Sequence, residues 1–174
     1  ARINPPWWQR APWRWGGGER ALTLEGPGLP QNDSGTAHLS VTDAAGNAVA
    51  ITGTINTLYG SGITVPGTGI VLNNEMDDFN TAPGHPNLYD LVQGEANLVA
   101  PGRRMLSSMS PTLAWKEREA IALGARGGSM IPTSTLQTLL NLVVDGDDLQ
   151  AAIDRPRIHH QWLPDEIRAE PDAL

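Results

Sequence analysis

The sequence predicts an α+β fold in which antiparallel strands precede helices. Two segments, residues 36–55 and 112–123, have the alternating apolar and polar pattern of hairpin strands. Residues 129–144 instead carry apolar side chains at helical spacing. Strands that come first and helices that follow are typical of a layered α+β domain. The length of 174 residues fits one such domain or a piece of one.

Residues 1–35 differ in composition from the remainder and are predicted to form an irregular leader or linker. They contain four of the six Trp residues, and residues 25–35 are almost entirely turn-forming. The Trp and Arg cluster is compatible with an interfacial membrane patch or a sugar-binding patch. No helical or alternating pattern organises it, which favours a tail that docks on another chain or has no fixed structure.

The first predicted hairpin begins at Thr36, directly after the leader. Residues 38–41 and 48–55 alternate, and Asp-Ala-Ala-Gly-Asn forms the turn between them. Four Gly between residues 60 and 69 indicate a flexible loop, after which the apolar residues 69–72 predict a buried strand. Residues 80–94 contain two Pro and two Gly, so we expect a long surface loop there.

A second hairpin is predicted where residues 112–115 and 120–123 flank a turn at residues 116–118. The helix predicted for residues 129–144 carries its apolar positions at Ile131, Leu136, Leu139, Leu140 and Val143. Asp147 or Asp148 is expected to cap a short helix that ends before Pro156.

Composition and charge exclude several classes of protein. There is no cysteine, so disulfide scaffolds, cysteine-ligated zinc sites and thiol catalysis are ruled out. Residues 36–174 hold sixteen acidic against eight basic side chains, and the whole chain has a formal net charge of −7. This acidic body argues against nucleic acid or an anionic membrane surface as a partner. No apolar stretch approaches the roughly 20 residues of a transmembrane helix, so a membrane partner is not expected.

Thr36 is the candidate nucleophile. It follows Gly35 at the composition boundary and opens the first strand, a position at which a threonine usually has only a structural role. If the Gly35–Thr36 bond were cut, Thr36 would have both a hydroxyl and a free α-amine, whose ordinary pKa is about 7.7–8.0. One residue would then supply both the nucleophile and its general base.

Three other segments carry polar groups suited to a site, and each has a plainer interpretation. Backbone N–H groups of residues 124–129 suit an oxyanion at a helix start, or form an ordinary Gly-Gly turn. Residues 73–78 suit an ammonium group, Ca²⁺ or simply water, and residues 107–110 suit a carboxylate or lie in a turn. His159 and His160 are sequence neighbours that face opposite sides of a strand, so they do not predict a shared metal.

Eight short motifs occur in an order that one known family shares. They are Thr36-Ala-His-Leu-Ser-Val41, Asp43-Ala-Ala-Gly-Asn-Ala-Val-Ala50, Thr54-Ile-Asn56, Leu72-Asn-Asn-Glu-Met-Asp-Asp-Phe79, Pro83-Gly-His-Pro-Asn-Leu-Tyr89, Leu106-Ser-Ser-Met-Ser-Pro-Thr112, Gly124-Ala-Arg-Gly-Gly-Ser129 and Arg157-Ile-His-His-Gln-Trp-Leu-Pro-Asp165. Together they resemble the small, catalytic subunit of γ-glutamyltransferases from residue 36 to about residue 170. The resemblance implies an N-terminal nucleophile hydrolase, with a four-layer αββα sandwich of which this chain is only part. A precursor of this family cuts itself into a large and a small subunit, and the new N-terminal threonine is the nucleophile.

The resemblance implies a role for each matching residue. Thr36 would attack the γ-glutamyl carbonyl after cleavage at Gly35–Thr36, and Thr54 would orient it through a hydrogen bond. The groups implied to bind the substrate are Asn56, Glu75 and Asp78 for its α-amino group, Ser107 and Ser108 for its α-carboxylate, and Gly127 and Gly128 for the oxyanion. Tyr89 matches a tyrosine on a lid loop, and active-site lids are often such Pro- and Gly-rich segments. No metal and no organic cofactor is implied.

The sequence departs from the family pattern in several places. The residue after the nucleophile is often a second threonine, and here it is Ala37. The family's small subunit usually continues several tens of residues past the His-Gln-Trp-Leu-Pro segment, so residues 36–174 are expected to be a catalytic region that is incomplete at its C-terminus. Residues 1–35 would be the end of the large subunit or another leader. The large subunit normally supplies an Arg that clamps the α-carboxylate, and neither Arg103 nor Arg104 matches it.

The resemblance implies γ-glutamyl transfer from glutathione or other γ-glutamyl amides to water, an amino acid or a peptide. Two alternatives stay open: a cephalosporin or glutaryl acylase activity on the same fold, and a non-catalytic fragment or assembly partner. The Asn56, Glu75 and Asp78 set favours the γ-glutamyl donor, whereas the expected truncation favours the fragment. The implied partner is a large subunit from the same precursor, the implied location is the periplasm or outside the cell, and the isolated chain is expected to be inactive.

Overall fold

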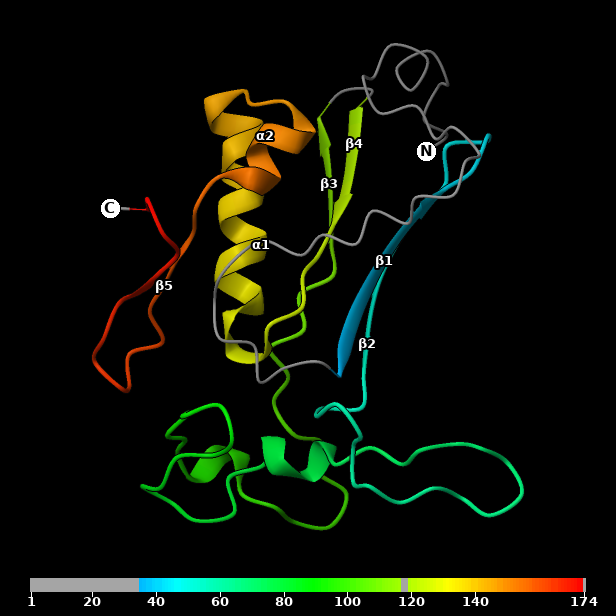
Figure 1. Ribbon diagram of the computed structural model, residues 1–174, viewed down its shortest axis with the longest axis vertical. Helices are drawn as coiled ribbons and strands as arrows, with labels where there is room; N and C mark the ends of the chain where they lie inside the picture. The colour runs from blue at the N-terminus through cyan, green and yellow to red at the C-terminus, as the bar shows by residue number, and fades with distance from the viewer. Residues whose placement is uncertain (1–34, 117–118, 174) are drawn as a thin grey trace.

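The computed structural model describes residues 35–116 and 119–173 (Figure 1). Its strands are β1 (Thr36–Thr42), β2 (Ala48–Thr54), β3 (Thr112–Lys116), β4 (Glu119–Leu123), β5 (Ile158–His159) and β6 (Arg168–Ala169). Its helices are the 3₁₀ turns η2 (Glu75–Asp78), η3 (Glu95–Asn97) and η4 (Gly128–Met130), the α-helices α1 (Ile131–Leu140) and α2 (Leu149–Asp154), and the π-turn η5 (Asn141–Asp145). Residues 1–34 of the leader predicted for residues 1–35 lie outside the described residues.

Strands β1 and β2 form the first predicted hairpin. They pair antiparallel along their whole length, from Thr36 opposite Thr54 to Thr42 opposite Ala48. The Asp43 carboxylate closes the turn by accepting hydrogen bonds from the backbone N–H groups of Ala45 and Asn47, each at 2.9 Å. Asp side chains stabilise turns in this way. The turn therefore fixes the register that sets Thr36 opposite Thr54.

The two faces of this hairpin have opposite character. Thr36, His38 and Ser40 lie on one face, and the Ser40 hydroxyl donates to the carbonyl oxygen of Ala122 in β4 at 3.0 Å. The hairpins approach so closely that a Cβ on Gly124 would lie 2.3 Å from the His38 ring. The other face carries the exposed apolar side chains of Leu39, Val41, Val49 and Ile51.

The second hairpin and the helices after it also match the prediction. Strands β3 and β4 pair antiparallel, with residues 117–118 of the predicted turn outside the described part. In the view of Figure 1 this hairpin is drawn between α1 and the β1–β2 hairpin. Helix α1 follows η4 directly and has a Pro in its first turn, where proline is well tolerated. Ile131 at its start is only 1% exposed and anchors the helix in the core.

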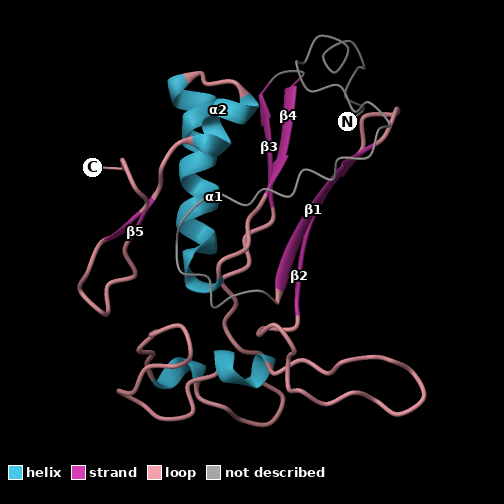
Figure 2. Ribbon diagram, viewed as in Figure 1, coloured by secondary structure: helices cyan, strands magenta, loops and turns pink. Residues whose placement is uncertain are grey.

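The helix predicted for residues 129–144 is divided into three parts, which Figure 2 colours as one continuous helical stretch. A 3₁₀ turn begins it, α1 forms its centre, and a π-turn ends it at Gly146, whose φ is 76°. Glycine commonly ends helices in this left-handed conformation. Asp148 then caps α2, since its side chain accepts from the Ala151 N–H at 2.8 Å, and α2 ends before Pro156 as expected.

The strand predicted for residues 69–72 was wrong. Ile70 and Leu72 are 59% and 42% exposed, and only an isolated bridge joins Thr64 to Val71. Residues 61–72 form a narrow ribbon held by main-chain hydrogen bonds such as Leu72 N–H to Ile63 O at 2.8 Å. The ribbon extends away from the hairpins (Figure 1), so none of the described residues buries its apolar run.

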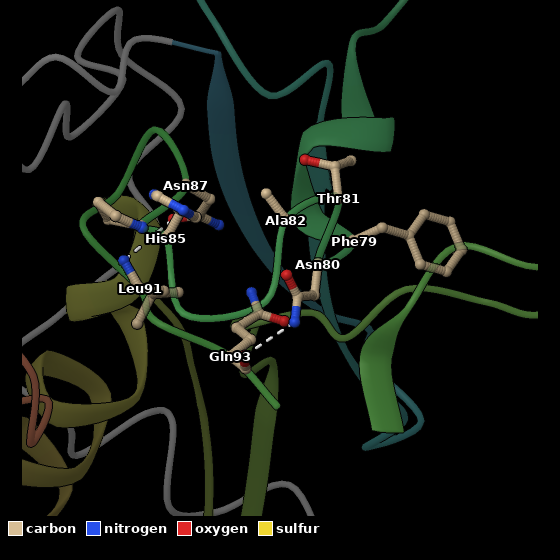
Figure 3. Close-up of a pocket in the computed structure, with 9 residues that line it drawn as sticks. Phe79, Asn80, Thr81, Ala82, His85, Asn87, Leu91 and Gln93 are labelled. Atoms are coloured by element: carbon tan, nitrogen blue, oxygen red, sulfur yellow. Dashed lines mark hydrogen bonds between the residues drawn. The ribbon is translucent and has the colours of Figure 1, made fainter. Parts of the chain in front are cut away.

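Residues 80–94 form the predicted loop without helix or strand. Figure 3 shows a small hollow inside it, lined by residues that include Phe79, Asn80, His85 and Gln93. The buried Asn80 side chain donates to the Gln93 carbonyl oxygen at 2.8 Å and so holds the two ends of the loop together. The loop is thus pinned at its base, while the side chains of residues 81–86 are exposed.

Candidate active site

Thr36 is buried at the first position of β1. Its side chain is 7% exposed, and its Oγ1 donates to Thr54 Oγ1 at 3.0 Å. Thr54 Oγ1 also accepts from the Asn56 N–H at 2.8 Å. The second bond orients the Thr54 hydroxyl, and the first fixes the Thr36 side chain on the inward face of the hairpin.

Gly35 is required by close contact with the chain beyond β2. Its carbonyl oxygen accepts from the Ile55 N–H at 3.2 Å. A Cβ at this position would lie 2.4 Å from the Asn56 carbonyl oxygen and 2.5 Å from that of Thr57. Such contacts are far inside van der Waals distance, so only glycine fits directly before Thr36.

Asn56 connects the end of β2 to two loops. It is 2% exposed and has a positive φ of 74°, a conformation that non-glycine residues adopt rarely and that clusters at functional sites. Its side-chain amide donates to the Asn74 carbonyl oxygen at 3.2 Å. Its side-chain oxygen accepts a hydrogen bond from the Tyr89 hydroxyl. The tyrosine of loop 80–94 is thereby held next to Thr36.

Gly128 makes room for that tyrosine. It has a φ of 55°, and a Cβ on it would lie 2.5 Å from the Tyr89 ring. Its carbonyl oxygen accepts from the Ser108 hydroxyl at 2.7 Å. Gly127, with a φ of 126°, directly precedes η4. Both the backbone conformation and the neighbouring ring therefore require glycine at residue 128.

Most of the predicted site residues gather around one small pocket. Its lining consists of Thr36, Thr54, Asn56, Glu75, Asp78, Tyr89, Ser107, Ser108, Met109, Gly128 and Ile131. Gly35 and Gly127 adjoin lining residues in sequence without lining it themselves. Segments that are far apart in the chain thus meet at the pocket that Thr36 lines.

The acidic side of the pocket carries an unsatisfied oxygen. Glu75 Oε2 is buried and has no hydrogen-bond partner among the described residues. A buried carboxylate oxygen without a partner is costly, because it has lost its hydrogen bonds to water and has formed none with the protein. A cationic or N–H donor of a ligand would restore the missing bond.

Sequence reasoning missed several residues that shape the site. Met109 and Ile131 line the pocket, and no pattern singled them out for that role. Asn97 is 6% exposed and joins two sides of the site: its amide donates to the Asp78 carbonyl oxygen at 2.7 Å, and its side-chain oxygen accepts from the Leu106 N–H at 3.0 Å. A lone Asn in a loop carries no sequence signal for such a position.

The neighbouring histidines have separate partners. His159 is 4% exposed and bonds to Thr133 Oγ1 at 2.8 Å and to Gln161 Oε1 at 2.9 Å. His160 is exposed and contacts Asp165 at 3.1 Å. Among the described residues no group of three or more His, Asp or Glu side chains is arranged to hold a metal ion. Arg103 is exposed and donates to the Ala96 carbonyl oxygen, away from the pocket lining.

His38 is half-buried, and its ring lies close to Gly124 at the end of β4. Burial lowers the pKa of its imidazole, because the charged form loses solvation. Its Nε2 lies 3.0 Å from Ser40 Oγ, whose own proton goes to the Ala122 carbonyl oxygen. Nε2 must therefore carry a proton, and in the neutral ring Nδ1 accepts from the Thr52 hydroxyl at 2.8 Å.

A buried threonine at the start of a strand, packed hairpins and a following helix match part of the four-layer αββα sandwich of the N-terminal nucleophile hydrolases, the fold of solved structures that are similar to this chain. A crystal structure of a Helicobacter pylori gamma-glutamyltranspeptidase mutant shares this fold: it is 49% identical, has a TM-score of 0.73, and the match covers 76% of this chain and 72% of that one. The gamma-glutamyltranspeptidase family profile matches residues 18–174. The chain belongs to the gamma-glutamyltranspeptidase family.

Curated relatives agree with this assignment. The glutathione hydrolase proenzyme of Pseudomonas sp. (strain A14) is 49% identical over 150 residues, which cover 85% of this chain. The glutathione hydrolase proenzyme of Escherichia coli (strain K12) is also 49% identical over 150 residues, which cover 83% of this chain. The chain spans about a quarter of the length of these relatives, 26% in each case. Within the described residues, no helix is long and apolar enough to cross a membrane.

Proposed function

We propose that this chain is the catalytic region of an enzyme that transfers γ-glutamyl groups from glutathione or other γ-glutamyl amides to water, an amino acid or a peptide. The observation that carries the proposal is the pocket in which Thr36 lies beside Thr54, two acidic side chains and two serines. The family of the chain supports the same chemistry, since two of its relatives are named glutathione hydrolase proenzymes.

The proposed reaction has two halves. The Thr36 oxygen bonds to the γ-glutamyl carbonyl carbon while the α-amine of Thr36 takes the hydroxyl proton. The tetrahedral oxyanion collapses, the carbon–nitrogen bond breaks, and the leaving amine receives that proton. Water or an acceptor amine then attacks the ester carbon and gives a proton to the same α-amine. The bond between that carbon and the Thr36 oxygen breaks, the α-amine returns the proton to the Thr36 oxygen, and glutamate or a new γ-glutamyl amide leaves.

The other groups would act on the charges that this reaction develops. Backbone N–H groups of Gly127 and Gly128 would stabilise the oxyanion, and one such donor typically contributes about 10²–10³-fold to kcat. Thr54 would keep the nucleophile aligned through the 3.0 Å bond between their hydroxyls. Every step uses groups of the protein and the substrates alone.

Substrate recognition is proposed to depend on the amino-acid end of the donor. Glu75, Asp78 and Asn56 would bind the α-ammonium group, and the buried, unpartnered Glu75 oxygen supports this assignment. Ser107 and Ser108 would bind the α-carboxylate. A glutaryl acylase substrate lacks the ammonium group and would leave that oxygen unpaired, which favours a γ-glutamyl donor.

Self-cleavage at Gly35–Thr36 is proposed to generate the nucleophile. While that bond is intact, the Thr36 nitrogen is an amide and cannot act as a base. The close packing of Gly35 against Asn56 and Thr57 supports a built cleavage site, because it excludes every side chain at the residue before the nucleophile. The large subunit released from the same precursor would be the partner of this chain.

The test is a Thr36→Ala precursor compared with the unchanged one. Mass spectrometry should find a new N-terminus at Thr36 only in the unchanged protein, and only that protein should hydrolyse a γ-glutamyl anilide. A glutaryl amide measured in parallel separates the acylase alternative. Efficient cleavage elsewhere that yields an active enzyme without a terminal Thr36 would overturn the proposal, and inactivity on both substrates after cleavage at Thr36 would favour a non-catalytic role.

A further inference from the structure

Contacts from other segments hold Tyr89 at the Thr36 pocket, which it lines. Its hydroxyl bonds to the Asn56 side chain, its ring lies against Gly128, and its carbonyl oxygen accepts from Gln161 Nε2 at 3.1 Å. The first two contacts belong to the site already described. The third comes from the segment between β5 and β6, which is 72 residues further along the chain.

The Gln161 amide is fully used and has only one workable orientation. Its Nε2 donates to the carbonyl oxygens of Tyr89 and Leu163, each at 3.1 Å, and its Oε1 faces His159 Nε2 at 2.9 Å. Carbonyl oxygens only accept, so the amide nitrogen must point toward them. His159 must then donate through Nε2.

The same hydrogen-bond chain continues to the start of α1. The buried His159 ring bonds through Nδ1 to Thr133 Oγ1 at 2.8 Å, and Thr133 lies in the first turn of the helix that follows Gly128. The carbonyl of Tyr89 is therefore tied, through Gln161 and His159, to the rigid element that carries the candidate oxyanion turn. Loop 80–94 has no helix or strand of its own to supply such rigidity.

We propose that Gln161 is a positioning residue that fixes the main chain at Tyr89 and so keeps the tyrosine over the nucleophile. This proposal rests on the proposed function and on the lid role that the family resemblance implies for Tyr89. A second link, the ion pair between Arg168 and Asp90 at 3.1 Å, is more exposed and contributes less, as surface ion pairs usually do. When Gln161 loses its amide donor, the lid opens more often and the donor binds less tightly.

Gln137 provides a matched control. Its amide donates to the carbonyl oxygens of Thr133 and Ile158, at 2.9 and 2.7 Å, and its side-chain oxygen accepts from the Ile158 N–H at 3.0 Å. It therefore anchors the same C-terminal segment to α1 with the same chemistry, but its hydrogen bonds do not reach the lid. Gln137→Met should lower the stability of the protein without changing how often the lid opens. Gln161→Met should lower the stability and also make the lid open more often.

The experiment is hydrogen exchange of peptides from residues 80–94 in the processed, assembled enzyme. Exchange should rise about five- to tenfold in Gln161→Met, the effect of losing one net hydrogen bond, and stay unchanged in Gln137→Met. With a γ-glutamyl anilide, Gln161→Met should raise KM by a similar factor and change kcat less. Gln161→Glu, which keeps the oxygen that faces His159 and loses the donor, serves as the second variant and should behave alike.

Unchanged lid exchange in either Gln161 variant would overturn the proposal, as would an equal rise in Gln161→Met and Gln137→Met. The exchange measurement needs no turnover. An enzyme that is inactive on γ-glutamyl donors would therefore contradict the proposed function and leave the lid test intact.

Discussion

At the scale of single residues, the site depends on side chains whose positions follow from backbone register. Thr36 and Thr54 are opposite each other because the Asp43 turn fixes the hairpin pairing. Asn56 reaches the same place by adopting a positive φ just after β2 ends. The hydroxyl pair is therefore a consequence of hairpin geometry, and replacing either threonine should leave the register intact.

The motifs name most of the residues that line this pocket, because each motif can be identified from a short stretch of sequence. Each named residue lies in a short continuous motif, so the resemblance could place it individually. Asn97 and Gln161 act through main-chain carbonyl groups of other segments. Such contacts depend on how loops fold back in space, and neither composition nor spacing encodes them.

Asp78 tests the proposed ammonium subsite at this scale. Asp78→Asn removes a negative charge from the pocket, and removing one partner of a desolvated charge pair typically costs about 2–5 kcal/mol. We expect kcat/KM for γ-glutamyl donors to fall at least tenfold in the processed enzyme. A des-amino glutaryl donor, which has no ammonium group, should show a much smaller change. Equal losses on both donors would indicate that Asp78 acts only on the structure.

At the scale of elements, the sequence predicts correctly those helices and strands that a local sequence pattern determines. Both hairpins, α1 and the Asp148 cap of α2 follow from alternation, helical spacing and capping chemistry. The strand expected at residues 69–72 failed because an apolar run predicts burial without saying what covers it. Leu136 and Leu140 make the same point on α1, since they are 53% and 43% exposed despite their helical spacing.

His38 links three strands and gives the protein a pH-dependent element. It bonds within the β1–β2 hairpin to Thr52 and, through Ser40, to Ala122 of β4. Burial lowers its folded-state pKa, so below about pH 6.5 the unfolded chain takes up a proton that the folded chain resists. The stability contributed by His38 is therefore complete above that pH and decreases as the pH falls through it.

The corresponding measurement compares urea midpoints of the processed enzyme and its His38→Gln variant at pH 7.5, 6.5 and 5.5. The variant should be less stable at pH 7.5, and the difference between the two proteins should shrink toward pH 5.5. Parallel curves would mean that His38 titrates alike in the folded and unfolded states.

At the scale of the whole molecule, the described residues leave large apolar surfaces uncovered. Leu39 pairs with Ile51, and Val41 with Val49, on the outward face of the first hairpin. These four side chains are between 45% and 57% exposed. Contiguous exposed apolar patches mark interaction surfaces. A sandwich fold needs a second layer on that face, and the chain spans only about a quarter of the length of its curated relatives.

This face predicts how the chain depends on its proposed large subunit. Leu39→Thr combined with Ile51→Thr places β-branched residues, which suit strands, at both positions but removes apolar area. Fully burying such a side chain contributes about 1.5–3 kcal/mol. Leu39 and Ile51 are already about half-buried, so association covers only the remaining half, and the double variant should weaken association with the large subunit about tenfold or more. The conservative pair Leu39→Ile and Ile51→Val should associate almost normally. Co-purification and analytical ultracentrifugation of the cleaved precursor measure this directly. Tight association of the threonine pair, with the hairpin intact by circular dichroism, would show that the large subunit docks elsewhere.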